Sequence, residues 1–522
     1  MSRLASTQKR RIIRIMKLSL LTLMLWTICI ISLSATIPPE AVAILYNTKT
    51  PESLKLAEMY REARHIPQEN LIGLELPVTA DISRDNYEQK IAKPLRAEFE
   101  KRNWWKRQKD SSGMVGPVEN KIRVLVLMRG VPLRIQPQAI ANPKNHPVDD
   151  HNEASVDSEL AMFGVETTPI NGVMQNKFYQ SEKPITQAGL PFLILTARID
   201  GPSFTTCERM IRDALETEKN GLWGMAYVDI ANKIPEGDQW LENVVKANGP
   251  AGIPTVVDRF NDTLPKNYPM LDAAYYYGWY DWHVSGPFLN PKFRFRKGAV
   301  AMHLHSFSAD QLTDATKNWS APLLEKGATV TIGNVYEPYL GLTHHFGIIH
   351  QKLLEGNSWV EACWMAMPVV SWQGVVLGDP LYRPCLHLGG TGVKQENDVA
   401  FRAIRAAAVE WENDPKERQK QLEKAAERMQ SGVLAEAIGL DLLGKKSAAA
   451  SQWFLKAKVF YPKLEDQLRQ DFHMIGNDRF AQRIDLTISG LRDAQTRYSS
   501  LPEAEALKGW LDILLPPPAP AK

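Results

Sequence analysis

The chain contains 522 residues, of which 44% are hydrophobic and 23% are charged. Its 62 basic and 59 acidic residues give a formal charge of +3, but six of the basic residues fall within the first 17 positions. The rest of the chain has no basic excess for binding nucleic acid, and its few, widely spaced cysteines exclude a fold held together by a disulfide framework.

The N-terminal segment has the pattern of an export signal. Residues 1–17 are basic and contain no acid, residues 18–33 are uncharged, and the small residues Ser34 and Ala35 follow. Because the uncharged stretch is shorter than the roughly 20 residues of a membrane span, we predict a cleaved signal peptide over residues 1–35. The alternative is an uncleaved membrane anchor. In either case the body of the protein is expected outside the cytoplasm, in the periplasm, on the cell surface or secreted.

From residue 36 to about 390, strand-like and helix-like segments alternate. This alternation predicts an α/β domain whose mostly parallel sheet is flanked by helices, in a caspase-like or flavodoxin-like arrangement. We expect strands at 41–46, 70–76, 121–128, 192–196, 224–229, 255–258, 299–305, 327–333 and 374–380, and helices at 52–64, 84–102, 205–219 and 240–248. Ser83 is expected to cap the second of these helices. Residues from about 135 to 190 lack a strong period, which predicts a long loop.

The C-terminal part of the sequence has a different character. Helical patterning dominates residues 395–512, and no repeat of fixed period is evident, so we predict an all-helical domain. Residues 513–522 are rich in proline and predict a disordered tail.

Several charged and polar residues follow directly after expected strands. Ligands of parallel sheets bind outside the carboxyl ends of the strands, so these residues are candidates for ligand binding. They are Arg129, Arg134, Arg198, Asp200, Asp229, Asp258 and Asn334, joined by Asp157 and Glu159 from the long loop. An internal network of ion pairs that ties the loop to the sheet explains the same residues equally well. No glycine-rich nucleotide-binding pattern follows the first strand, which disfavours nucleotides.

Histidines gather near two of the expected strand ends. His303 and His305 alternate along one strand, and His344 and His345 follow the next strand together with Glu337. Imidazole and carboxylate groups are competent ligands of zinc or iron, so the pattern permits a divalent metal. Buried histidines that are hydrogen-bonded within the protein are the alternative. No other cofactor is indicated.

If the protein catalyses a reaction, we expect Glu337, His305, Asp200 and Ser306 to carry it. Paired carboxylates suit glycoside hydrolysis, and a serine with a nearby imidazole suits acyl transfer. Neighbouring residues of a strand point to opposite faces, which weighs against His305 as the base for Ser306.

An unusually dense aromatic run extends from Tyr275 to Trp282. Aromatic side chains with polar tips suit a rim that binds peptides or sugars. Trp279 and Trp282 follow Gly278 and are the candidates for exposure, whereas a packed core strand explains the three tyrosines equally well.

Four short segments spread over residues 38–385 carry a resemblance to a protein family. They are Arg129-Gly-Val-Pro-Leu-Arg134, Ser155-Val-Asp-Ser-Glu-Leu160, Arg198-Ile-Asp-Gly201 and Gly378-Asp-Pro-Leu-Tyr-Arg-Pro384. In these segments the chain resembles a sporadically distributed family of exported bacterial proteins whose function is not established.

The order of segments from Tyr276 to Asp379 gives a second, more distant resemblance. A strand with a glycine turn, a strand that ends in small polar residues, a Gly-Ala strand and a closing Leu-Gly-Asp-Pro follow one another. This order resembles the gingipain branch of the caspase-like cysteine peptidases. The resemblance implies a caspase-like scaffold, a histidine in the turn and a cysteine after the next strand. Here Trp279 and Ser306 stand at those positions.

Two functions are compatible with these observations. The first is a hydrolase that acts on peptide or glycan material outside the cytoplasm. The alternative is a catalytically inert binding or scaffolding module, whose partners would be extracytoplasmic peptides, proteins or glycans. Contact with a membrane is expected only through an uncleaved leader. The sequence does not indicate an oligomeric state.

Overall fold

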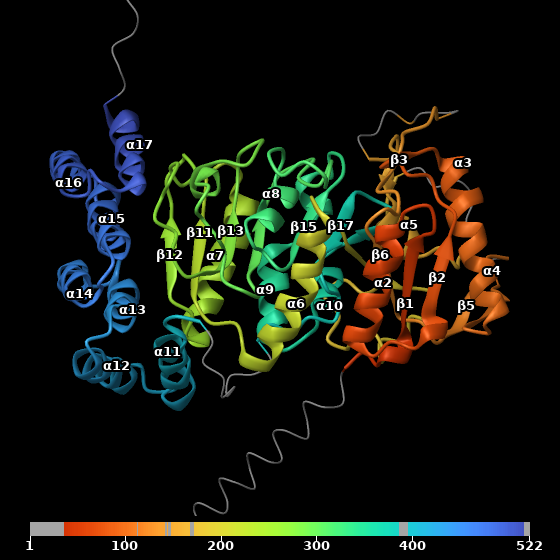
Figure 1. Ribbon diagram of the computed structural model, residues 1–522, viewed down its shortest axis with the longest axis horizontal. Helices are drawn as coiled ribbons and strands as arrows, with labels where there is room; N and C mark the ends of the chain where they lie inside the picture. Colours follow the sequence, from red (N-terminus) through yellow and green to blue (C-terminus); the bar gives the residue numbers. More distant parts are fainter. Residues whose placement is uncertain are drawn as a thin grey trace, which may run out of the picture.

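The computed structural model describes residues 36–111, 113–140, 144, 148–166, 172–385 and 395–515. The predicted leader and the prolines of the predicted tail lie outside these residues. An α/β region with two adjoining sheets occupies most of the molecule, and a column of helices stands at one end beside strand β12 (Figure 1).

The first sheet has six strands in the order β15-β17-β10-β6-β1-β2. They are β1 (Val42–Asn47), β2 (Leu71–Leu74), β6 (Val124–Met128), β10 (Leu195–Ile199), β15 (Thr331–Asn334) and β17 (Gly374–Leu377). β2, β1, β6 and β10 pair in parallel. β17 meets β10 through one parallel residue pair, Arg198 with Leu377, and pairs antiparallel with β15. The strands β6 and β10 are buried along their whole length. The sequence of β6 is accordingly continuous and apolar, whereas β10 contains Thr196 and Arg198, whose polar groups are hydrogen-bonded within the protein.

The second sheet has four parallel strands in the order β12-β11-β13-β14. They are β11 (Met225–Asp229), β12 (Thr255–Asp258), β13 (Ala273–Gly278) and β14 (Val300–His303). A bridge between Val300 and Val330 joins this sheet to the segment before β15, so the two sheets meet edge to edge. When the strands are numbered along the chain, β2-β1-β6-β10 and β12-β11-β13-β14 both read 2-1-3-4. The second sheet therefore repeats the strand order of the first.

The strands pair mostly in parallel, as expected, but they form two sheets where one was expected. The expected strands at 299–305 and 327–333 belong to different sheets, and β15 and β17 form an antiparallel pair at one edge of the first. The physical reason is that a buried apolar strand shows the same sequence pattern whichever direction its neighbour runs.

Helices from both halves of the α/β region share one hydrophobic core with the two sheets. They are α2 (Pro51–Arg64), α6 (Phe204–Asn220), α7 (Pro235–Ala251), α9 (Phe346–Leu354) and α10 (Trp359–Met365). The expected cap is confirmed, because the Ser83 hydroxyl accepts a hydrogen bond from the Asn86 N–H. The helix after it is divided by a wider turn at Tyr87–Ala92, next to α4 (Lys93–Lys101).

The expected long loop contains short elements that dock on the sheet. They are β7 (Arg134–Ile135), β8 (Ala154–Ser155), α5 (Val156–Leu160) and β9 (Met174–Gln175). The hairpin of β4 (Trp105–Lys109) and β5 (Val115–Asn120) was not expected from the sequence, because its strands are mostly exposed and carry little apolar pattern.

The C-terminal region is helical, as the sequence predicts. Its helices are α11 (Asp398–Glu410), α12 (Pro415–Met429), α13 (Gly432–Leu442), α14 (Ser447–Phe460), α15 (Leu464–Phe480), α16 (Ile484–Arg497) and α17 (Glu505–Leu514). These helices share a hydrophobic core with one face of the second sheet. For example, the rings of Tyr268 and Phe472 lie 5.0 Å apart. The helical region is therefore fixed against the sheet by apolar packing.

Candidate functional site

Arg198, at the end of β10, is the centre of a buried ion-pair network. Its side chain is fully buried and lies 2.6 Å from an Asp157 oxygen and 3.1 Å from an Asp200 oxygen. It also donates to the carbonyl groups of Val131 and Pro132. Burial opposes the charge, but the carboxylates of Asp157 and Asp200 outweigh this effect and raise the pKa of Arg198. The guanidinium group is thus satisfied from within the protein.

Three other charged residues that the sequence suggests for ligand binding, around the first sheet and the long loop, also have partners within the protein. Arg129 donates to the Gly201 carbonyl, and Arg134 forms ion pairs with Asp81 and Asp310. Asp310 lies beyond β14, so its pair with Arg134 joins the segments that follow strands of both sheets. The Glu159 carboxylate pairs with Arg84 at 2.6 Å and accepts from the Ser371 hydroxyl at 2.7 Å. The geometry is that of an internal network tying the long loop to the sheet.

Replacing Asp157 tests the role of this network. The Asp157→Asn change leaves a fully buried guanidinium group with one carboxylate fewer, so we expect it to lower the free energy of unfolding by about 3–5 kcal/mol. Arg129→Gln affects a partly exposed pair and should cost only about 1 kcal/mol or less. Urea unfolding of both variants measures the difference. Equal, small losses would contradict a structural role for the buried charge.

The two positions implied by the peptidase resemblance do not form a catalytic pair. Trp279 is 1% exposed, and its indole N–H donates to Asp238 at 2.8 Å. Within the described chain, no imidazole forms a hydrogen bond with the Ser306 hydroxyl. His305 contacts the backbone carbonyl of Ser306 instead. Glu337 is exposed and accepts from the Tyr339 N–H at 3.0 Å.

The four histidines occupy separate environments. His303 is buried in a stack with Trp319, with ring centroids 3.4 Å apart, and burial lowers its pKa well below the ordinary value. His344 is buried, and His345 caps α9. No group of three or more His, Cys, Asp or Glu side chains in the described part of the chain could hold a metal ion. Asn334 is likewise buried, and its amide donates to the Thr343 hydroxyl at 2.9 Å.

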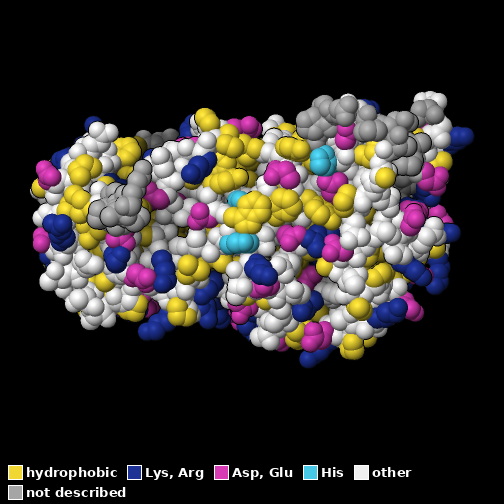
Figure 2. Space-filling view, turned by 90° about the horizontal axis from the view of Figure 1, so that it is seen from above, with side chains coloured by type: hydrophobic (Ala, Val, Ile, Leu, Met, Phe, Trp, Pro, Cys, Tyr) yellow, Lys and Arg dark blue, Asp and Glu magenta, His cyan; other side chains and the backbone are white. Residues whose placement is uncertain are grey.

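Figure 2 shows a face of the molecule on which exposed hydrophobic side chains and histidine lie next to one another. Trp282 is 57% exposed and Tyr280 is 42% exposed. Both rings lie 4.9 Å from the ring of His305, which they help to cover. The expectation of exposure is thus confirmed for Trp282 and wrong for Trp279, whose ring packs on Gly237.

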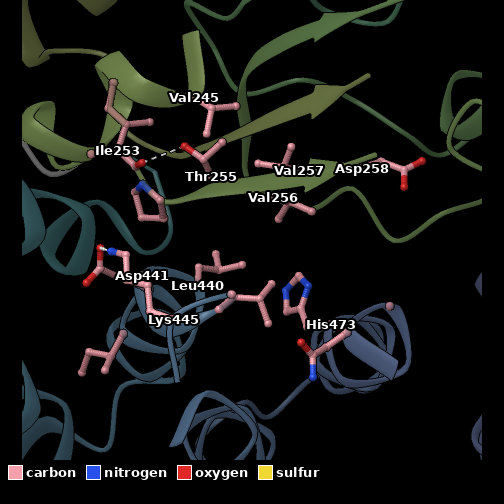
Figure 3. A pocket seen from close by; sticks show the side chains of 18 of the residues that line it. Val245, Ile253, Thr255, Val256, Val257, Asp258, Leu440, Asp441, Lys445 and His473 are labelled. Carbon is pink, nitrogen blue, oxygen red and sulfur yellow. Dashed lines mark hydrogen bonds and ion pairs between the residues drawn. The ribbon is translucent and has the colours of Figure 1, made fainter. Parts of the chain in front are cut away.

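A groove that the sequence did not reveal lies between the second sheet and the helical region (Figure 3). Its volume is about 420 Å³, within the range of ligand pockets. The strand β12 forms one wall, and apolar residues of the helices face it. These include Ile438, Leu440, Phe472 and Trp510. No local sequence pattern predicts this groove, because its walls come from segments about 150 to 250 residues apart in the chain.

Two buried acids stand at one end of the groove's strand wall. Asp229 and Asp258 end neighbouring parallel strands in register and are 1% and 5% exposed. One oxygen of each carboxyl has no hydrogen-bond partner in the described chain. Burial and then the neighbouring Asp258 raise the pKa of Asp229, while burial and then Asp262 raise the pKa of Asp258 to about 8. Asp258 also lines the groove.

His473 projects from α15 toward β12 in the groove (Figure 3). Its Nε2 atom lies 2.8 Å from Glu436, whose carboxylate also accepts two hydrogen bonds of 2.7 Å from Arg469. The Tyr461 hydroxyl donates to the same carboxylate at 2.6 Å. These contacts fix the orientation of the imidazole ring.

Comparisons with known proteins identify no relative of this chain. No model of a protein family, no curated protein and no solved structure matches it. In the described residues, every helix is too short or too polar to cross a membrane.

The buried carboxyl of Asp258 predicts a pH dependence of stability. Its pKa is higher in the folded than in the unfolded chain, so its contribution to stability is complete below pH 4 and is lost as the pH rises through about 8. Asp258→Asn removes this loss. We expect the variant to gain roughly 2–4 kcal/mol relative to the wild type between pH 5 and 9.

Urea unfolding at pH 5, 7 and 9 provides the measurement. Asp314→Asn is the control, because the Asp314 carboxyl is half-buried and hydrogen bonds from Thr316 lower its pKa. Its difference in stability from the wild type should therefore be the same at each pH. Parallel curves for the wild type and Asp258→Asn would contradict a protonated, buried Asp258.

Proposed function

We propose that this protein is an exported, catalytically inert binding module for peptides, built on a caspase-like scaffold. The observation that carries the proposal is the state of the two positions implied by the peptidase resemblance. A buried indole, Trp279, replaces the base, and Ser306 lacks an imidazole partner in the described chain. A serine hydroxyl without a base is a weak nucleophile. The leader pattern supports export.

The strand order supports the scaffold part of the proposal. The first sheet begins with the order 2-1-3-4 of flavodoxin-like sheets, in which a fifth strand would follow directly. Here the last strand, β17, lies between β10 and β15 and pairs antiparallel with β15. We expect this insertion of a last strand in a caspase-like sheet and not in a flavodoxin-like one.

The cysteines support a function without a thiolate. Cys207, Cys363 and Cys385 are all free thiols, and burial raises the pKa of each. A cysteine nucleophile requires the opposite, a lowered pKa in a partly exposed position.

A hydrolase remains the second candidate because of one observation. The buried pair of Asp229 and Asp258 has raised pKa values beside a groove, and such pairs are found at sites of acid–base chemistry. Acid–base hydrolysis by these two carboxyl groups would require neither Ser306 nor a cysteine. Substitutions at these positions therefore distinguish it from hydrolysis by a gingipain-type peptidase.

Binding and cleavage assays on residues 36–522 separate the two candidates. We expect members of a peptide panel to bind and to remain intact by mass spectrometry, while a glycan panel also remains intact. Ser306→Ala and Glu337→Gln should change peptide affinity by less than about twofold. Cleavage abolished by Asp258→Asn would favour the hydrolase, and cleavage abolished by Ser306→Ala would contradict the proposal.

Thiol alkylation tests the absence of a reactive cysteine. In the native protein at pH 8, we expect Cys207, Cys363 and Cys385 to resist iodoacetamide, because none is an accessible thiolate. All three should react after unfolding in guanidinium chloride, which is the positive control. Rapid modification of one cysteine in the native protein would count against an inert site.

A further inference from the structure

Strand β12 is the outer strand of the second sheet. Among the residues that the structure describes, it pairs with β11 alone, and its other edge has no strand partner. Two hydrogen bonds fix the phase of this pairing. The Ala226 N–H donates to the Pro254 carbonyl and the Ile230 N–H donates to the Asp258 carbonyl, each at 2.9 Å.

These two bonds show which residues of β12 direct their backbone N–H and C=O groups toward β11 and which direct them to the open edge. Residues of a strand direct their N–H and C=O groups to alternate sides, so Val256 faces β11. Thr255 and Val257 direct their N–H and C=O groups away from β11. In the described chain, no hydrogen bond reaches these backbone groups of either residue. Such groups are a template for pairing with another strand.

The helical region turns this open edge into one wall of a groove. Val256 and Val257 line the groove on the sheet side, and Leu440 of α13 and Phe472 of α15 line it on the helical side. In Figure 3, Leu440 lies across the gap from β12. Because helices cover the far side, the groove suits a single extended segment and not the flat edge of another sheet.

The polar groups that line the groove differ between its two ends. Arg418 lines the groove and belongs to α12, which packs against α11. Ala408 of α11 lies next to Gly252, just before β12. These contacts place Arg418 toward the end of the groove at which β12 begins. In the described chain the Arg418 guanidinium group has no ion-pair partner. At the other end the buried Asp258 carboxyl has one unpartnered oxygen, and the neighbouring Arg259 is already paired with Glu242 at 2.7 Å. A peptide is complementary when its C-terminal carboxylate lies near Arg418.

We propose that this groove binds the C-terminal end of an extended apolar peptide as an additional strand on β12. The peptide runs antiparallel to β12, with its carboxylate toward Arg418, and exchanges backbone hydrogen bonds with Thr255 and Val257. This inference rests on the proposed peptide-binding function and names its site, its direction and its class of ligand.

Val257→Pro tests the added strand. Proline removes the outward N–H of residue 257, while the ladder bonds of Val256 and Asp258 to β11 remain, and proline is tolerated at such edge positions. Val257→Thr keeps both the N–H and the branched shape and is the matched control. The probe is a labelled hexapeptide library with Val, Ile, Leu, Thr or Tyr at the last four positions and a free C-terminus.

Fluorescence anisotropy measures binding of this library to residues 36–522. We expect Val257→Pro to weaken binding roughly tenfold and Val257→Thr to change it by less than about twofold. Amidation of the peptides and Arg418→Gln should each weaken binding several-fold, without adding to one another when combined. Equal affinity for amidated peptides would overturn the proposed direction.

Amide hydrogen exchange gives a second readout that does not depend on a variant. On peptide binding, the Thr255 and Val257 amides should become protected, whereas the Val256 and Asp258 amides are protected from the start. Unchanged exchange at Thr255 and Val257 in a saturated complex would overturn strand addition.

The outcomes also separate this inference from the proposed function. If Val257→Pro fails to fold, as judged by its thermal unfolding, Leu440→Trp fills the groove from the opposite wall and should abolish binding. Peptide binding that survives these variants overturns the groove as the site but leaves a peptide-binding module elsewhere. Failure of the wild type to bind any member of the library overturns the inference and removes support from the function as well.

Discussion

The arrangement of this protein depends on apolar packing between the second sheet and the helical region. Tyr227 and Val256 of the sheet share one core with Phe472 and Trp510 of the helices. Because this contact buries large aromatic side chains, it holds the helices in a fixed place beside β12. The groove exists only because the same helices pass β12 without pairing with its outer edge. Stability and the candidate site therefore have a common origin.

Buried arginines join separate elements in both the α/β region and the helical region. Arg198 joins the long loop to β10, and Arg469 joins α15 to α13 through Glu436. Each guanidinium group is fully buried and receives carboxylates from its own domain, so neither is available to a ligand. Asp229 and Asp258 form no ion pair in the described chain, and each has an unpartnered oxygen. The acid pair beside the groove is therefore a better candidate for contact with a ligand than the charged network around Arg198.

The sequence predicted local elements well and their assembly only in part. The strand at 255–258 and the cap at Ser83 agree with the structure because short-range patterns and a hydroxyl determine them. The division into two sheets was not predictable, since the pattern of an apolar strand does not record which strands lie beside it. Asp229 and Asp258 were placed at strand ends and lie side by side, but the groove itself depends on distant helices. Trp279 and Trp282 look alike in sequence, yet only tertiary packing on Gly237 buries the first.

An exposed strand edge is normally a liability, because it promotes pairing between molecules. The helical region limits this risk at β12 by covering the approach to the edge, yet it leaves the N–H and C=O groups of Val257 without partners in the described chain. A helix placed closer to β12 would fill the gap with apolar side chains and would leave no more backbone polar groups unpaired than there are now. The structure instead keeps a space of about 420 Å³ along the strand. A protected edge with room for one more strand is what selective capture of an extended peptide requires.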